Sequence, residues 1–114
     1  MNRNNVYSRV YTPEKWEMVN KDNKTIIDDF LTEYKQQKKS ENTIKQYFND
    51  LRLIAIKILE DFENKSFLEM TKKDFRRLNL MFDEMGMSPA RCNRLHSSIN
   101  SLLTFVENDD DYDD

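Results

Sequence analysis

Glycine, proline, cysteine and histidine are scarce in this chain of 114 residues, which holds one glycine, two prolines, one cysteine and one histidine. A single cysteine excludes an internal disulfide and is typical of a reducing compartment. A single glycine excludes a glycine-rich phosphate loop. No apolar run approaches the roughly 20 residues of a membrane span, and the polar N-terminus does not resemble a signal peptide. We therefore expect a cytoplasmic protein with no membrane partner.

Arrangements of residues that support catalysis are also scarce. His96 is the only histidine, so a Ser-His-Asp or Cys-His triad could form only around it. Cys92 lies four residues before His96, but two ligands fall short of the three or four that hold zinc. The aspartates near the C-terminus lack the spacing and the glycine of a calcium loop. We expect Cys92 to be a small buried hydrophobe, and we expect no metal, no cofactor and no catalysis by this chain alone.

The net charge of −3 conceals an uneven distribution of acidic residues. The last eight residues, ENDDDYDD, hold six of the 21 acidic groups. Without this segment the chain has 18 basic and 15 acidic residues. This mild positive excess is well short of what would by itself indicate a nucleic-acid binder. Charge alone is therefore a weak guide to the partner.

The spacing of apolar residues predicts an all-α fold. Apolar residues recur at steps of three and four, and no segment alternates like a strand. We expect a single domain in which residues 23–107 form a four-helix bundle, between an N-terminal arm at 1–22 and an acidic tail at 108–114. The arm is rich in asparagine and is expected to be loop-like, apart from a short helical turn over 13–18. The tail is expected to be disordered or a linker. The predicted helices cover residues 23–38, 40–62, 71–85 and 88–107.

The helix predicted over residues 40–62 organises the chain. In its second half Leu53 and Ile56 join the apolar stripe, so this half is expected to be central in the bundle. Its first half is expected to be exposed or to contact a polar partner. Opposite the stripe this first half carries Asn42, Lys45, Gln46 and Asn49.

Local signals mark the other helix ends. Thr71 and Asp74 have the spacing of a capping box. Gly86 stands where a helix end requires a residue with positive φ. Ser88 followed by a proline is the favoured order of cap and first helical residue. Outside the four helices, the side chains expected to pack against the core are Trp16, Phe67 and Met70, although Trp16 could also be an exposed binding residue.

The remaining candidate for a site is a polar, partly basic surface made by two helix starts, near Ser40 and Ser88. Helix N-termini offer free amides and a positive dipole end that favour phosphate, and Arg and Lys add charge. We expect the two starts to share one side of the molecule, although each residue could also be an ordinary cap or solvated side chain. The candidate DNA-binding residues are Lys39, Ser40, Asn42, Thr43, Lys45, Gln46, Ser88, Arg91, Asn93, Arg94 and Ser97.

Several motifs follow one another in an order that matches a known family. The pattern Ser-x-x-Thr-x-x-x-Tyr is present at Ser40, Thr43 and Tyr47, and a Gly-x-Ser turn is present at 86–88. The last helix is rich in arginine and ends in serines, leucines and a phenylalanine: Arg91, Arg94, Ser97, Ser98, Leu102, Leu103 and Phe105. In this order residues 14–108 resemble the SAM-like, N-terminal core-binding domain of phage integrases, the tyrosine recombinases.

The resemblance implies a domain whose second and fourth helices face duplex DNA and clamp it at the recombination site, in support of DNA integration and site-specific recombination. It also implies that the catalytic Arg, Lys, His and Tyr residues lie in a following domain. This chain would then be a fragment of a longer bacterial or phage recombinase that acts with other recombinase protomers, and the acidic tail would begin the interdomain linker. Cys92, Asn93 and His96 depart from the family pattern, which predicts weak DNA affinity for the isolated domain.

A protein-interaction bundle with no nucleic-acid role is the competing interpretation. In this case Leu53, Ile56 and Trp16 would form an exposed docking patch. An independent enzyme is the third interpretation, and the scarcity of catalytic residues speaks against it.

Overall fold

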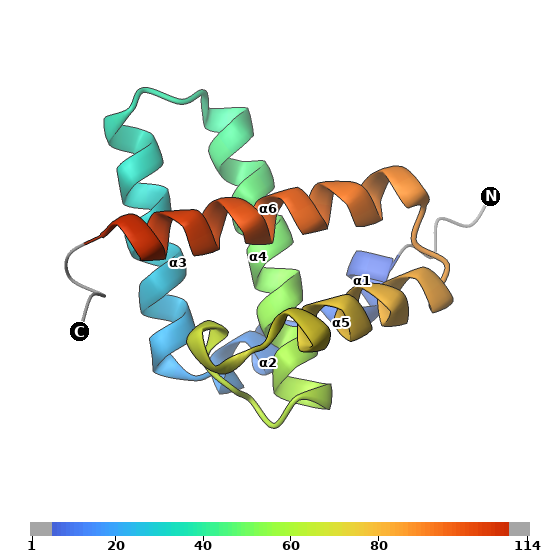
Figure 1. Ribbon diagram of the computed structural model, residues 1–114. Coiled ribbons are helices and arrows are strands. Elements are labelled where there is room, and N and C mark those ends of the chain that lie inside the picture. Colours follow the sequence, from blue (N-terminus) through green and yellow to red (C-terminus); the bar gives the residue numbers. More distant parts are fainter. Residues whose placement is uncertain (1–5, 110–114) are drawn as a thin grey trace.

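Four long helices form the bundle of the computed structural model, which describes residues 6–109 (Figure 1). Helices α3 and α4 make a hairpin, α6 crosses both of them, and α5 lies beside α6 and crosses the second half of α4 (Figure 1). The predicted all-α fold is confirmed, and the described residues contain no strand. The bounds of the four helices are Lys21–Gln36 for α3, Glu41–Asp61 for α4, Lys72–Glu84 for α5 and Pro89–Asn108 for α6.

Two short helices, α1 (Val6–Val10) and α2 (Pro13–Met18), precede the four long ones. Helix α2 confirms the predicted helical turn, and the Thr12 hydroxyl caps it by accepting a hydrogen bond from the Lys15 amide. The prediction that the rest of the arm is loop-like was wrong, because α1 packs against α4 and buries Val6 and Val10. Two valines four residues apart share one face of a helix, and this face is covered only when the arm folds back. Residues 1–5 lie outside the described part of the chain.

Helix α3 also begins earlier than predicted. The side chain of Asn20 accepts a hydrogen bond from the Asn23 amide at 2.7 Å, so Asn20 is the N-cap and the helix starts at Lys21. An asparagine cap is a common device for satisfying a free amide of the first turn. Helix α6 ends at Asn108, one residue beyond the predicted bundle, and the predicted tail beyond Asp109 lies outside the described residues.

The second half of α4 forms the centre of the core, as predicted. This helix packs against α1, α2, α3, α5 and α6, so its apolar side chains are covered all round. The exposed docking patch of the competing interpretation is therefore wrong: Leu53 and Ile56 are fully buried, and Trp16 packs edge-on against the Phe48 ring, with 6.1 Å between ring centroids. The packing of Trp16 against the core is confirmed. The apolar α4 side chains that are at most 1% exposed are Leu51, Leu53, Ile54, Ala55, Ile56 and Ile58.

The predicted helix ends are confirmed by hydrogen bonds. The Ser40 hydroxyl accepts from the Thr43 amide, and the Ser88 hydroxyl accepts from the Arg91 amide, each at 3.1 Å. The Thr71 capping box is present in both directions, and the hydrogen bond from the Thr71 amide lowers the pKa of Asp74. Gly86, which follows the C-cap Met85 of α5, has a φ of 100°, a value that residues with a Cβ rarely adopt.

Asn23 holds the connection between α4 and α5 against α3. Its fully buried side chain accepts a hydrogen bond from the Phe67 amide at 2.7 Å and donates one to the Lys65 carbonyl at 2.9 Å. Phe67 begins the short 3-10 helix η1 (Phe67–Glu69), and its ring is 1% exposed. Met70 follows and is 8% exposed, so both residues enter the core as predicted.

Replacement of Asn23 by alanine tests this connection. We expect the free energy of unfolding to fall by about 2 kcal/mol, because the buried Phe67 amide loses its acceptor, whereas the Lys65 carbonyl keeps a hydrogen bond from the Asn20 side chain. Urea denaturation followed by circular dichroism measures the change. Asn100→Ala, an exposed position on α6, is the control and should leave stability nearly unchanged. An equal effect of the two substitutions would contradict the role of Asn23.

Candidate nucleic-acid interface

A groove of about 660 Å³ lies between the first halves of α4 and α6, with α1 at one side. The two helices cross near their middles, so the groove occupies the corner between their leading halves (Figure 1). We call it the α4–α6 groove. Among residues 6–109, four cations line it and no carboxylate does; its lining residues are Tyr7, Asn42, Lys45, Gln46, Asn49, Arg52, Arg91 and Arg94.

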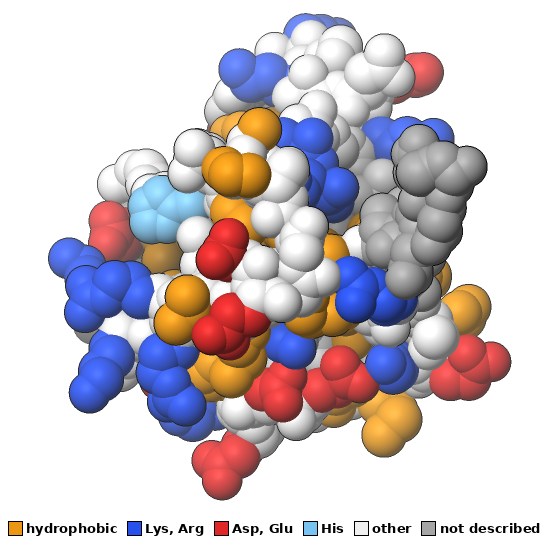
Figure 2. All heavy atoms as spheres, turned by 90° about the vertical axis from the view of Figure 1, so that its right-hand side faces the viewer, with side chains coloured by type: hydrophobic (Ala, Val, Ile, Leu, Met, Phe, Trp, Pro, Cys, Tyr) orange, Lys and Arg blue, Asp and Glu red, His pale blue; other side chains and the backbone are white. Residues whose placement is uncertain are grey.

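The end of the molecule near the α6 start carries many basic side chains. Figure 2 views this end from the right-hand side of Figure 1 and shows Lys and Arg side chains in its upper half and a further group of them at its lower left. Most of the Asp and Glu side chains in this view lie below the upper group. A phosphate strand that approaches the upper half therefore meets mainly positive charge.

The structure brings some of the predicted site residues together and leaves others apart. Those that line the α4–α6 groove are Asn42, Lys45, Gln46, Arg91 and Arg94. The caps Ser40 and Ser88 do not line it, because the crossing of the helices points the two starts in different directions (Figure 1). The two helices therefore face each other not at their caps but in the first two turns after each cap.

The other predicted residues lie outside this groove. The ammonium group of Lys39 lies over the Tyr34 ring, 5.5 Å from its centroid. Thr43 accepts a hydrogen bond from the Ser40 hydroxyl at 2.9 Å. Asn93 and Ser97 are exposed and do not line the groove. For Asn93 and Ser97, exposure is the only feature that agrees with a role in binding.

A buried carboxylate lies directly beneath the groove, and the sequence analysis missed it. Asp50 is 0% exposed and accepts hydrogen bonds at 3.1 Å from both Nε and Nη2 of Arg94. The hydroxyl of Ser98 donates to it at 3.0 Å, and Nη2 of Arg91 lies 3.2 Å away. A buried charge is tolerated when it is paired and hydrogen-bonded in this way. The sequence feature that could have indicated a buried Asp50 is its position between Tyr47 and Ile54, at the edge of the apolar stripe of α4.

Arg52 was also missed, and it ties the N-terminal arm to the groove. Its guanidinium carbon lies 4.1 Å from the centroid of the Tyr11 ring and 4.5 Å from that of Phe48, within the range of cation–π contacts. It donates hydrogen bonds to the Tyr7 hydroxyl and to the Asn49 side chain. The contact could not be foreseen, because it depends on how α1 docks on α4.

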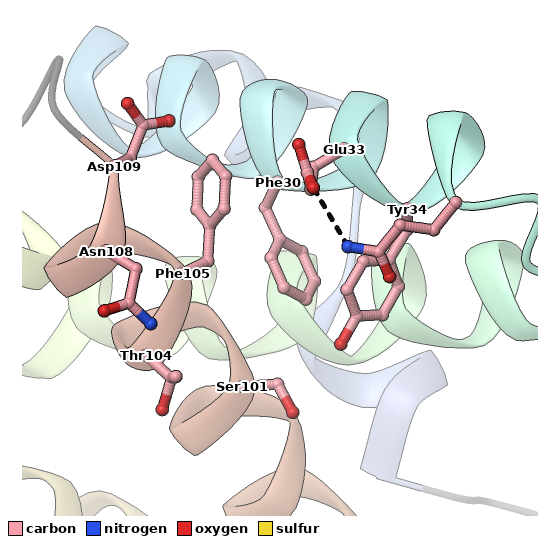
Figure 3. Close-up of a pocket in the computed structure, with 9 residues that line it drawn as sticks. Phe30, Glu33, Tyr34, Ser101, Thr104, Phe105, Asn108 and Asp109 are labelled. Carbon is pink, nitrogen blue, oxygen red and sulfur yellow. Dashed lines mark hydrogen bonds between the residues drawn. The ribbon is translucent and has the colours of Figure 1, made fainter.

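A second hollow, of about 520 Å³, lies between α3 and the second half of α6 (Figure 3). Glu33 and Asp109 line it together with the rings of Phe30, Tyr34 and Phe105, and no cation in the described part of the chain does. Burial and a hydrogen bond to Tyr47 raise the pKa of Tyr34. Carboxylates repel phosphate, so this hollow is unsuited to nucleic acid and the α4–α6 groove is the better candidate.

The described residues show no sign of a metal centre. No group of three or more His, Cys, Asp or Glu side chains in residues 6–109 is placed to hold an ion. Cys92 is 7% exposed, as predicted, and burial raises the pKa of its thiol. Across the same residues, no helix has the length and apolar character needed to cross a membrane.

Comparison with curated proteins relates the chain to a recombinase-like protein. The chain is 26% identical over 97 residues to the SPbeta prophage-derived recombinase-like protein YomM of Bacillus subtilis strain 168. The aligned region covers 85% of this chain and 28% of that protein, so the chain spans little more than a quarter of its relative. No protein-family model and no solved structure matches. The similarity supports a relationship to recombinases.

Proposed function

We propose that this chain is the DNA-binding, core-binding domain of a phage-type tyrosine recombinase. In this proposal the α4–α6 groove contacts the sugar–phosphate backbone of duplex DNA at the recombination site. The observation that carries it is the convergence of four cations, Lys45 and Arg52 from α4 and Arg91 and Arg94 from α6, on a groove that no carboxylate of the described residues lines. The relationship to a recombinase-like protein points in the same direction.

The chemistry of the groove favours phosphate contacts over the reading of bases. Arg and Lys supply charge-assisted hydrogen bonds to phosphate, and short amides such as Asn42 and Asn49 allow a backbone to approach. Contacts of this kind position a protein on DNA without selecting a sequence. We therefore infer that the groove sets the orientation of the domain on DNA.

Catalysis and assembly are assigned to other parts of a longer protein. Residues 6–109 form a small helical bundle in which no catalytic domain is evident. Because the chain spans 28% of its relative, we propose that strand exchange is carried out by a further domain and that other recombinase protomers assemble with it on DNA.

Titration of a fluorescent duplex with the chain, followed by anisotropy, tests the proposal. Two to four phosphate contacts predict that affinity falls roughly 10- to 100-fold between about 50 and about 200 mM salt. Lys45→Ala should weaken binding to unrelated duplexes equally, because a phosphate contact carries no sequence information. Lys73→Ala, an exposed position on α5, is the matched control.

Two results would contradict the proposal. Equal binding by wild type and Lys45→Ala would show that the α4–α6 groove is not the contact surface. No change of anisotropy, together with a dimer that persists in high salt on gel filtration, would favour a protein-interaction bundle instead.

A further inference from the structure

The two arginines of α6 that line the α4–α6 groove are both held by one buried carboxylate. We propose that Asp50 is a positioning residue for DNA binding: it fixes the guanidinium groups of Arg91 and Arg94 at the floor of the groove. This inference rests on the proposed function, because it assigns a role within the same groove.

Arg94 makes a bidentate contact with Asp50. Its Nε and Nη2 donate to the two different oxygens of Asp50, each at 3.1 Å. Such a contact fixes the plane of the guanidinium group, which a single hydrogen bond does not do. A guanidinium has five N–H donors, so the remaining ones are available to a ligand. The side chain of Arg94 is 40% exposed and lines the groove, which places these donors within reach of phosphate.

Arg91 is held more loosely by the same carboxylate. Its Nη2 lies 3.2 Å from Oδ1 of Asp50, and its side chain is 28% exposed. The Nε of Arg91 is buried and has no hydrogen-bond partner. The ion pair with Asp50 is therefore the contact that draws this side chain toward the floor of the groove.

Asp50 is itself held in place by a further residue of α6. Ser98, which is 2% exposed, donates its hydroxyl hydrogen to Oδ2 at 3.0 Å. Asp50 lies on α4, whereas Ser98, Arg94 and Arg91 lie on α6. The position of the two arginines in the groove thus depends on how α6 packs against Asp50 of α4.

A different role for Asp50 predicts the opposite outcome. If it acted only as a counter-charge, it would weaken DNA binding by neutralising the arginines, and its removal would strengthen binding. If it positions them, its removal leaves the arginines mobile and weakens binding, although the net charge becomes more positive. The sign of the change in affinity separates the two roles.

The first experiment compares wild type, Asp50→Asn, Arg94→Ala and the double variant in the duplex titration, at a temperature where circular dichroism shows each to be folded. Asp50→Asn should raise the Kd about tenfold, since Arg94 loses the carboxylate that accepts its two hydrogen bonds. In the Arg94→Ala background the same substitution should have a much smaller effect, because Asp50 acts mainly through Arg94. A purely structural role would give the same effect in both backgrounds.

The second experiment leaves Asp50 intact, which covers the case in which Asp50→Asn does not fold. Arg94→Lys keeps the positive charge but cannot form the two-pronged contact, and we expect the Kd to rise about fivefold. Arg76→Lys, an exposed position on α5, is the matched control and should bind as wild type does.

The outcomes for the two proposals are distinct. Tighter binding by Asp50→Asn, additive effects in the double variant, or wild-type binding by Arg94→Lys would each overturn the positioning role while leaving the proposed function intact. If wild type itself fails to bind any duplex, the proposed function is overturned and the positioning role with it.

Discussion

Replacement of Phe30 by alanine is expected to lower the free energy of unfolding by about 4 kcal/mol, within the range measured for buried phenylalanines. Phe30 is 0% exposed and stands where α3, α4 and α6 meet. Its ring lies 4.5 Å from Tyr34, 5.5 Å from Tyr47 and 5.7 Å from Phe105 between centroids. The substitution removes these ring contacts and leaves a cavity that the helix crossing cannot close.

Urea denaturation followed by circular dichroism measures this effect. The loss would be a large part of the roughly 5–15 kcal/mol that stabilises an ordinary domain. Leu80→Ala is the control, because Leu80 on α5 is 54% exposed and should contribute little. A loss at Phe30 no greater than that at Leu80 would show that the three helices do not depend on this ring.

Replacement of Asp50 by alanine is expected to lower the free energy of unfolding by about 3 kcal/mol, the lower end of the range for breaking a buried ion pair. The substitution leaves Arg94 without its two-pronged partner and the hydroxyl of Ser98 without its acceptor. We place the effect at the lower end because the side chains of Arg91 and Arg94 are 28% and 40% exposed, so water can solvate them again.

Salt distinguishes this buried pair from an ordinary surface pair. The decrease in the free energy of unfolding caused by Asp50→Ala should persist in high salt, because buried charges are screened much less than exposed ones. Asp28→Ala, an exposed position on α3, is the control and should change stability little at any salt concentration. If the loss at Asp50 disappears in high salt, the carboxylate is more hydrated than its burial indicates.

Several features could be predicted because their causes are local in sequence. A hydroxyl three residues before a free amide, as at Ser40 and Ser88, caps a helix whatever the chain does elsewhere. Gly86 ends α5 because the required φ is positive. The largely apolar second half of α4 similarly indicated a central helix, since water disfavours apolar surface on most sides of a helix.

Other features depend on contacts between distant residues, and local patterns do not report them. Val6 and Val10 are buried only because α1 folds back on α4. Asp50 and Arg94 are 44 residues apart and meet only through the angle at which α6 crosses α4. The same angle separated the two helix caps that we expected to share a side. The prediction of the site therefore identified several of its cations and missed the carboxylate that holds two of them.

The sequence by itself determined the four long helices, most of their ends and the residues that form the centre of the bundle, because each follows from hydrogen bonds and apolar periodicity within a few turns of one helix. Only the tertiary structure decided which polar side chains share a groove and which arginines are held by a buried charge. The physical reason is that a helix offers side chains all round its axis, and the crossing of α4 and α6 selects which of them face one another.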